Sequence, residues 1–301
     1  MSGQISLRGV ESRVALSVIG ATMLLGAGTG VADPVSPAGW TSNIQLGFPL
    51  PEGVYFIDTA YYMKRSGSTL APGLKEIDGI VNIPTVAWST PATVLGGRLE
   101  FIGFAAQAGV GINPGSVDGS SSWHRDFYNP ALLGGLVWDL GDGWSVGEFV
   151  GGFAPVDTDI GNNLGLGGNF WTFANVFGVA YNKDGWSLSA NLIYLNSGDD
   201  LDTGVNVQPD TVDVDFAAVK HINKSEIGLV GSASADVSDA LRNNWGDKEF
   251  SQFSLGGLVG HSFGSVTAEI FATRSLVANN QVGGGKDTRL WTRILIPLSA
   301  Q

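Results

Sequence analysis

The stretch DGWSLSANLIYLNSG, residues 184–198, repeats the opening of an earlier stretch, DGWSVGEFVGGFAP, residues 142–155. An Asp-Gly pair is typical of a tight turn between antiparallel strands, because both residues tolerate a positive φ. The residues after the second turn alternate between an apolar face and a small polar one: Trp186, Leu188, Ala190, Leu192 and Tyr194 against Ser187, Ser189 and Asn191. A period of two is the signature of a β-strand. The repeat therefore predicts two hairpins of one sheet.

Similar segments of about ten residues recur along the chain, which is the length of a membrane-spanning β-strand. We predict twelve, at 54–63, 79–89, 96–111, 128–140, 144–156, 170–181, 186–197, 212–222, 226–237, 251–262, 265–276 and 287–298. Their connections alternate between short turns, such as 141–143, and long polar stretches, such as 157–169. This alternation indicates an up-and-down sheet with two unlike ends.

Composition decides what kind of sheet this is. The 301 residues include 44 Gly and no Cys, and only 15% are charged, although 44% are hydrophobic. The lack of Cys excludes a disulfide framework and thiolate metal sites. A soluble β-sandwich is the alternative, but it needs a second sheet to cover each apolar face. We therefore predict an all-β protein: a transmembrane antiparallel up-and-down β-barrel of about 12 strands with periplasmic N- and C-termini.

The N-terminus has the features of a signal peptide. Arg8 and Arg13 precede an apolar stretch at 14–30, and Gly-Val-Ala then ends at Ala32. The alternative, a first transmembrane helix, is disfavoured because the run is short and Gly-rich. We predict a signal peptide at 1–32, a Pro-rich periplasmic leader or plug at 33–50 and the barrel at 51–301. The mature chain would keep 14 basic and 27 acidic residues, a net charge of −13 that argues against a nucleic-acid partner.

Aromatic residues flank the short turns on the apolar faces of the predicted strands. Trp and Tyr at these places are typical of the girdle at a membrane interface, because each ring is apolar and keeps one polar atom for the wet side. The predicted membrane-interface anchors are Trp138, Trp144, Tyr181 and Trp186.

Charged residues on the strands are predicted to face the lumen, since a midplane Arg on the lipid face costs about 2–4 kcal/mol. The predicted lumen-lining residues are Asp58, Arg98, Glu100, Glu148, Asp213, Asp215, Glu269, Arg289 and Arg293. Aromatic residues assigned to the same face are candidates for substrate contact: Phe56, Tyr62, Phe104, Phe149, Phe153 and Phe271. Such a lining suits an aromatic or aliphatic solute better than a sugar or an ion.

The sequence has few signs of catalysis or metal binding. His124, His221 and His261 are isolated in sequence, and no GxSxG motif is present. We predict no catalytic residues, no metal site, no cofactor and no enzyme activity. Acidic residues at Asp157, Asp159, Asp199, Asp200 and Asp202 fit solvated loop tips, and divalent-cation bridging to lipopolysaccharide is the alternative.

Several stretches resemble one family: PEGVYFIDTAYYMKRSG at 51–67, NPALLGGLVWDLGDGWSVGEFVGGFAPVDTD at 129–159, NFWTFANVFGVAYNKDGWSLSANLIYLNSGDD at 169–200 and DTVDVDFAAVKHINKSEIGLVGSASADVSD at 210–239. They are similar to the outer-membrane transporter family named for the MetA (meta) pathway of phenol degradation. The resemblance covers most of 50–298 and implies a barrel that transports hydrophobic or aromatic compounds. Barrels of this kind usually end in an aromatic residue that the assembly machinery reads, whereas this chain ends in Ser299, Ala300 and Gln301.

The resulting functional prediction is an outer-membrane channel of a Gram-negative bacterium for passive uptake of small hydrophobic or aromatic compounds. The alternative is a structural or adhesive barrel that acts through its long extracellular loops. The expected partners are outer-membrane lipid and lipopolysaccharide, the solute itself and the outer-membrane assembly machinery.

Overall fold

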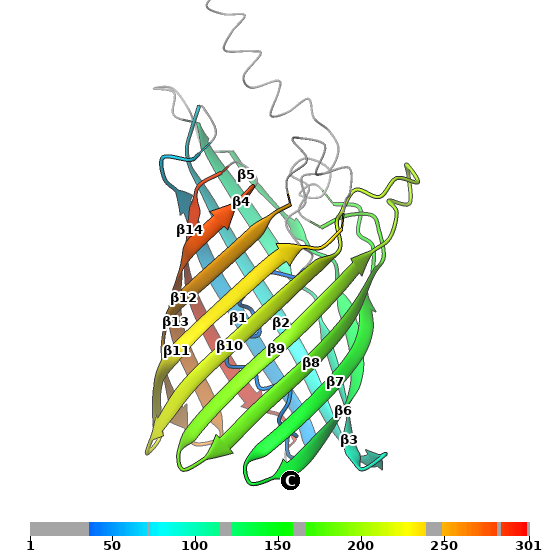
Figure 1. The fold of residues 1–301 in the computed structure, drawn as a ribbon, viewed down its shortest axis with the longest axis vertical. Helices are drawn as coiled ribbons and strands as arrows, with labels where there is room; N and C mark the ends of the chain where they lie inside the picture. The colour runs from blue at the N-terminus through cyan, green and yellow to red at the C-terminus, as the bar shows by residue number, and fades with distance from the viewer. Residues whose placement is uncertain are drawn as a thin grey trace, which may run out of the picture.

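The computed structural model describes residues 36–70, 73–114, 122–158, 167–238, 249–281 and 284–299. Within these ranges, fourteen strands form one antiparallel sheet. Their bounds are β1 (Gly53–Ser66), β2 (Leu74–Val94), β3 (Gly97–Phe104), β4 (Gln107–Pro114), β5 (Ser122–Phe127), β6 (Ala131–Gly141), β7 (Trp144–Phe153), β8 (Thr172–Lys183), β9 (Trp186–Ser197), β10 (Thr211–Ile222), β11 (Ser225–Asp236), β12 (Ser251–Phe263), β13 (Val266–Asn279) and β14 (Lys286–Pro297). Because β1 pairs with both β14 and β2, the sheet closes into a barrel (Figure 1).

Two positions around the barrel are each filled by a pair of collinear strands. The long strand β2 pairs with β3 through residues 85–94 and with β4 through residues 74–82. Likewise β3 pairs with β6, and β4 pairs with β5. Thus β3 continues into β4, and β5 continues into β6, with interruptions at 105–106 and 128–130. The fourteen strands fill twelve positions, which confirms the predicted closed 12-stranded barrel.

The interruption between β5 and β6 has local causes. Pro130 has no backbone N–H to give to the ladder. The adjacent Asn129 is fully buried, and its side chain donates hydrogen bonds to the carbonyls of Ala154 at 2.8 Å and Gly168 at 2.9 Å. This side chain therefore ties the strand junction to the residues that follow β7 and precede β8.

The repeated DGWS sequences form the turns predicted for them. Asp142 and Gly143 connect β6 to β7 with φ values of 53° and 86°, and Asp184 and Gly185 connect β8 to β9 with 54° and 73°. Two successive positive φ angles are the geometry that Asp-Gly favours in a tight hairpin. A further tight turn at Leu95–Gly96 joins β2 to β3, so β2 extends to Val94, beyond the predicted strand at 79–89.

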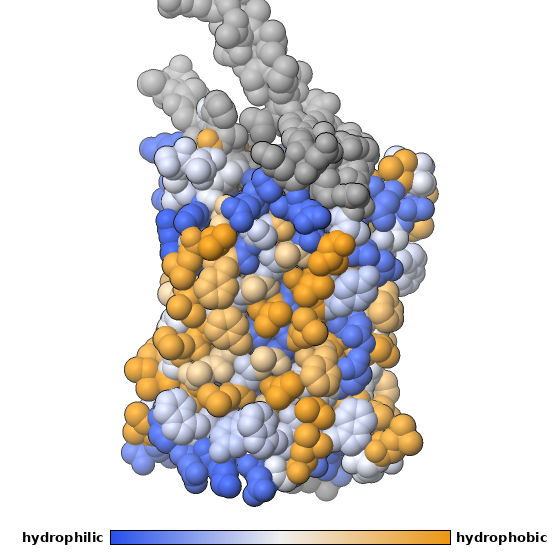
Figure 2. All heavy atoms as spheres, in the orientation of Figure 1, coloured by the Kyte–Doolittle hydropathy of each residue, from blue (hydrophilic) through white to orange (hydrophobic). Residues whose placement is uncertain are grey.

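The two faces of the barrel wall differ in chemistry. Exposed large apolar side chains, such as Leu192, Val259 and Ile270, form a band around the outside, and polar residues lie beyond it at both ends (Figure 2). An outer apolar band is what a lipid-embedded barrel requires. Within the described part of the chain, no helix has the length and hydropathy to cross a membrane.

The four predicted interface aromatics lie on the outer face at the short-turn end. Trp144 and Trp186 are 49% and 47% exposed, and Tyr181 packs its ring 4.9 Å from that of Trp144. The indole N–H of Trp138 donates to the Leu95 carbonyl at 3.0 Å. Their role as membrane anchors stays a prediction.

Candidate functional site

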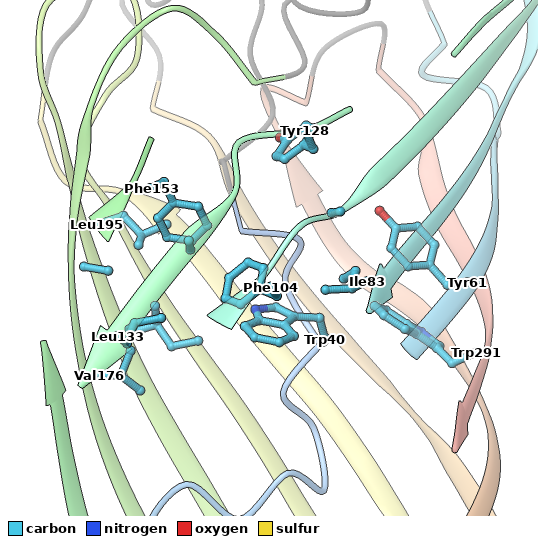
Figure 3. Close-up of a cluster of buried hydrophobic side chains, with 14 of the residues drawn as sticks. Trp40, Tyr61, Ile83, Phe104, Tyr128, Leu133, Phe153, Val176, Leu195 and Trp291 are labelled. Carbon is cyan, nitrogen blue, oxygen red and sulfur yellow. The ribbon is translucent and has the colours of Figure 1, made fainter. Parts of the chain in front are cut away.

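Residues 36–50, here called the N-terminal segment, lie inside the barrel (Figure 3) and lead to the start of β1 at the short-turn end (Figure 1). Ser36 is 2% exposed, Trp40 8% and Thr41 0%. These residues are the described part of the predicted leader or plug at 33–50. Residues 33–35 and the predicted signal peptide at 1–32 lie outside the described residues.

Asp215, on the lumen face of β10, holds the segment by its backbone. Its Oδ1 accepts the Gly39 N–H at 2.7 Å, and its Oδ2 accepts both the N–H and the hydroxyl of Thr41, at 2.9 and 2.7 Å. Gly39 has a φ of +96°, a conformation that favours glycine, and this turn directs the two N–H groups to one carboxylate. The negative charge is therefore balanced by three donors from the segment.

Two arginines of β14 bind carbonyl groups of the same turn. Arg293 donates to the carbonyls of Trp40 at 2.7 Å and Ser42 at 2.6 Å, and it also pairs with Glu269 at 3.0 Å. Arg289 donates to the Ala38 carbonyl at 2.7 Å. Hydrogen bonds to charged groups contribute about 1.5–3 kcal/mol each. The polar wall formed by β10, β13 and β14 thus fixes the segment on one side of the lumen.

Glycines allow the segment to touch the wall on the other side. A Cβ atom on Gly178 of β8 would lie 2.4 Å from the backbone nitrogen of Gly47, and one on Gly147 of β7 would lie 2.2 Å from the Leu46 carbonyl oxygen. Both distances are shorter than real Cβ contacts. Because glycine has no side chain, these two strand residues let the backbone of the segment approach the barrel wall closely.

An apolar cavity lies between Trp40 and the wall formed by β3 and β6 to β9. Figure 3 shows Trp40 beside Phe104, with Phe153, Leu133, Val176 and Leu195 on one side and Tyr61 and Trp291 on the other. The full lining is Ser36, Trp40, Thr41, Leu46, Ile102, Phe104, Leu133, Phe149, Phe153, Ala174, Val176, Ile193 and Leu195. The two hydroxyl groups are the polar side chains of this lining, so the cavity suits an apolar ligand.

Two cavities beside the N-terminal segment are small. The apolar cavity measures about 30 Å³, and a second cavity, lined by Ala38, Tyr61, Gln252, Gln281, Arg289 and their neighbours, measures about 60 Å³. An apolar cavity of about 150 Å³ is known to bind benzene. A ring-sized solute therefore needs the segment, or a side chain on it, to move.

Seven of the nine predicted lumen residues lie on the inner face: Arg98, Glu100, Asp213, Asp215, Glu269, Arg289 and Arg293. Five of them contact the N-terminal segment. Besides Asp215, Arg289 and Arg293, Glu100 accepts the Leu50 N–H at 2.9 Å. A fifth, Glu269, accepts the Asn43 side-chain N–H at 3.0 Å. Asp213 is fully buried, and its side chain lies beside Ser234 of β11 rather than in contact with the N-terminal segment.

Asp58 and Glu148 correct the prediction, because both face outward. Buried positions of β1 are the odd-numbered ones, which place Tyr61 inside and Asp58 outside, and β7 likewise turns Phe149 in and Glu148 out. Each outward carboxylate has a neighbour on the next strand. Asn82 donates to Asp58 at 2.7 Å, and Asn175 donates to Glu148 at 2.5 Å. Cross-strand amide partners reduce the penalty of an outward carboxylate, which is why charge alone misassigned these residues.

The predicted substrate-contact aromatics divide into three groups. Phe104, Phe149 and Phe153 line the apolar cavity. Phe271 also faces inward, but it stacks on Trp291 at 5.2 Å and 9° in the polar half of the wall. Phe56 and Tyr62 are corrections: both face outward on β1, where the Tyr62 hydroxyl donates to Asp78.

His221 is less isolated than its sequence neighbours suggest. Its Nε2 lies 2.8 Å from the Ser187 hydroxyl, and its Nδ1 lies 3.5 Å from Glu226. The Ser187 hydroxyl also donates to Asn182 Oδ1 at 2.5 Å. A serine nucleophile needs its proton held by the histidine, and here the Asn182 amide competes for that proton. Among the described residues, no three His, Cys, Asp or Glu side chains gather in a way that could hold a metal ion.

Sequence reasoning missed Trp40 and two inner-wall residues. Trp40 lies in the predicted Pro-rich leader at 33–50, and neither it nor Trp291 nor Arg65 is among the predicted site residues. Arg65 is 3% exposed and pairs with Asp287 at 2.7 Å. The alternation along β14 could have identified Trp291, because Asp287 and Trp291 lie on the same face as Arg289 and Arg293.

The acidic loop residues named above as an alternative cation site include Asp159, which lies outside the described residues.

A solved outer-membrane channel has a similar fold. The chain is similar in structure to a COG4313 outer membrane channel from Pseudomonas putida F1, with a TM-score of 0.65, 15% identity, and coverage of 83% of this chain and 97% of that chain. A Pseudomonas aeruginosa FadL homologue aligns with a TM-score of 0.44, 11% identity, and coverage of 91% and 100%. No curated protein matches the sequence significantly.

The family model matches most of the barrel. It is described as putative MetA-pathway of phenol degradation and covers residues 63–290. This range includes the three phenylalanines of the apolar cavity and the anchor Arg289, and it ends before Arg293. The chain therefore belongs to the family of the putative MetA-pathway of phenol degradation and has the fold of an outer-membrane channel.

Proposed function

We propose that the protein is a channel of the Gram-negative outer membrane through which small hydrophobic or aromatic compounds diffuse inward. The observation that carries the proposal is the apolar cavity inside the barrel, where Phe104, Phe149 and Phe153 face a lumen closed by the N-terminal segment. A sugar in this cavity would lose hydrogen bonds to water without replacement, at a cost of several kcal/mol. An aromatic ring would lose none.

The same proposal gives the N-terminal segment the role of a plug. The segment lies between the polar wall and the apolar one, and two cavities beside it, of about 30 and 60 Å³, are smaller than a ring. Its anchors at Asp215, Arg289 and Arg293 are hydrogen bonds to the backbone, which a movement of the segment can break and remake. Outside, the apolar band would face lipid, with lipopolysaccharide at the long-loop end.

The test is solute flux into proteoliposomes with lipopolysaccharide in the outer leaflet, which slows the background entry of apolar solutes. Entry of a small aromatic compound is compared with that of a sugar of similar size, and empty vesicles give the baseline. We expect faster aromatic entry with the folded protein and a higher conductance after deletion of 33–50. Equal entry would indicate a general pore, and no entry of either solute would contradict the channel.

A further inference from the structure

Trp40 places an aromatic ring of the chain itself at the end of the apolar cavity. Its indole lies 4.8 Å from the Phe104 ring at an angle of 52°, and Phe104 lies 5.5 Å from Phe153 at 76°. Tilted and edge-on contacts at these distances are the geometry that aromatic rings prefer for one another. The side chain is 8% exposed, so almost the whole ring is taken up by these contacts and by the aliphatic lining.

The indole also has a polar partner. Its Nε1–H donates to the Ser36 hydroxyl oxygen at 2.7 Å. The other hydroxyl in the cavity lining, that of Thr41, donates to Asp215. The subsite therefore offers two features to a ligand: aromatic faces on one side and one hydrogen-bond acceptor, Ser36 Oγ, on the other.

The ring and the backbone of the segment are held by different groups. Arg293 binds the carbonyl of Trp40, and Asp215 binds the N–H groups on either side of it, at Gly39 and Thr41. None of these contacts uses the indole. The side chain can therefore be removed or displaced while the anchors of the segment stay in place.

We propose that the Trp40 indole is an internal ligand that occupies an aromatic-binding subsite, and that an incoming solute binds there by displacing it. The ligand class is a planar aromatic ring with one N–H or O–H donor, such as indole or phenol. The inference rests on the proposed function, which supplies the solute, and adds the group with which the solute competes. The solute can bind only to molecules in which the subsite is vacant. The apparent affinity therefore equals the intrinsic affinity multiplied by the fraction of such molecules.

The first experiment measures indole binding by calorimetry to the purified full-length protein in detergent. We expect Trp40→Ala to bind indole at least tenfold more tightly than the wild type, because the competing ring is gone. The matched control is Trp88→Ala, which removes a Trp that is 49% exposed on the outer face and stacks on Phe101. This control should bind like the wild type. Equal affinity of Trp40→Ala and wild type would overturn the inference.

The second experiment tests the hydrogen bond. In the Trp40→Ala background, indole should bind more tightly than benzofuran, which has the same shape but no N–H donor. Adding Ser36→Ala should remove this preference while leaving the binding of benzofuran unchanged. A preference that survives Ser36→Ala would contradict the assignment of Ser36 Oγ as the acceptor.

A third measurement keeps the wild-type side chain and does not depend on the folding of Trp40→Ala. The protein is labelled with 5-fluorotryptophan, and the Trp40 resonance is identified from its loss in Trp40→Phe. Added indole should expose this resonance to broadening by a soluble paramagnetic agent, while the resonances of the other eight Trp residues stay unchanged. Continued protection of Trp40 at saturating indole would overturn displacement.

These results separate the inference from the proposed function. Aromatic flux through the wild type, without tighter indole binding by Trp40→Ala, would leave the channel standing and overturn the internal ligand. Tighter binding and displacement of Trp40, without flux through any variant, would support the internal ligand and overturn the channel.

Discussion

Asp215 Oδ2 accepts two hydrogen bonds from Thr41, one from the backbone N–H at 2.9 Å and one from the hydroxyl at 2.7 Å. The two residues are 174 positions apart in the chain. Their contact joins a strand of the barrel wall to the segment that fills the lumen. Because Asp215 Oδ1 also accepts the Gly39 N–H, one carboxylate fixes the turn that carries Trp40.

Replacing this carboxylate should loosen the segment. Asp215→Ala removes three hydrogen bonds to a charged group, each contributing about 1.5–3 kcal/mol. Losing even one of these hydrogen bonds changes the equilibrium constant between the held and the released segment by a factor of about ten. We expect a higher single-channel conductance in planar bilayers, because a released segment leaves the lumen wider.

Asp213 provides the matched control for Asp215. It lies two residues earlier on the same strand and the same face, but its carboxylate lies beside Ser234 of β11 and does not hold the N-terminal segment. Asp213→Ala should therefore leave the conductance near the wild-type value. An equal rise in both variants would show that lumen charge, rather than the anchor, sets the conductance.

Adding a methyl group at Gly178 should push the segment away from β8. A Cβ there would lie 2.4 Å from the Gly47 nitrogen, so Gly178→Ala cannot coexist with the observed contact. The chain has no Cys, which allows Ser42→Cys to report accessibility to a thiol reagent added from solution. Ser42 is 1% exposed, and we expect labelling to be severalfold faster when Gly178→Ala is added.

Gly257→Ala is the comparison for this effect. Gly257 lies on β12, and the nearest atom to a Cβ there is 3.8 Å away, an ordinary contact. This substitution makes the same change in composition without a clash, so labelling of Cys at position 42 should stay slow. Equally slow labelling with Gly178→Ala would show that the segment accommodates the methyl group.

Removing the amide that pairs with Asp58 should destabilise the barrel. Asn82 donates to Asp58 at 2.7 Å on the outer face, and Asn82→Ala leaves a carboxylate there with this partner gone. We expect a loss of about 1–3 kcal/mol in the free energy of unfolding, the usual effect of leaving a polar group unsatisfied. Denaturant unfolding in lipid vesicles measures it.

A double-mutant cycle gives the control for this pair. Removing both groups in Asp58→Ala with Asn82→Ala takes away the charge together with its partner. The double variant should be less destabilised than Asn82→Ala alone, because no unpaired carboxylate remains. Additive losses would mean that the two residues do not interact.

The alternation of residues along single strands predicted most of the inner-wall residues correctly. It failed where a side chain on the neighbouring strand stabilises an outward charge. In β10 and β14, the alternation of charged and apolar residues placed Asp215 and Arg293 inside, as the structure does. In β1, the rule that charge points inward assigned Asp58 to the wrong face. The Asn82 side chain that stabilises Asp58 comes from another strand, and the sequence of β1 alone contains no sign of it.

The sequence by itself determined the architecture, because its signals are local. A period of two, Asp-Gly turns and the alternation of short and long connections specify antiparallel hairpins, and a largely apolar outer face requires closure in lipid. The position of the N-terminal segment inside the barrel depends on contacts between distant parts of the chain. Trp40 meets Phe104, Gly39 and Thr41 meet Asp215, and Gly47 meets Gly178 across long sequence separations. These contacts depend on how the closed barrel surrounds the segment, which no local pattern encodes.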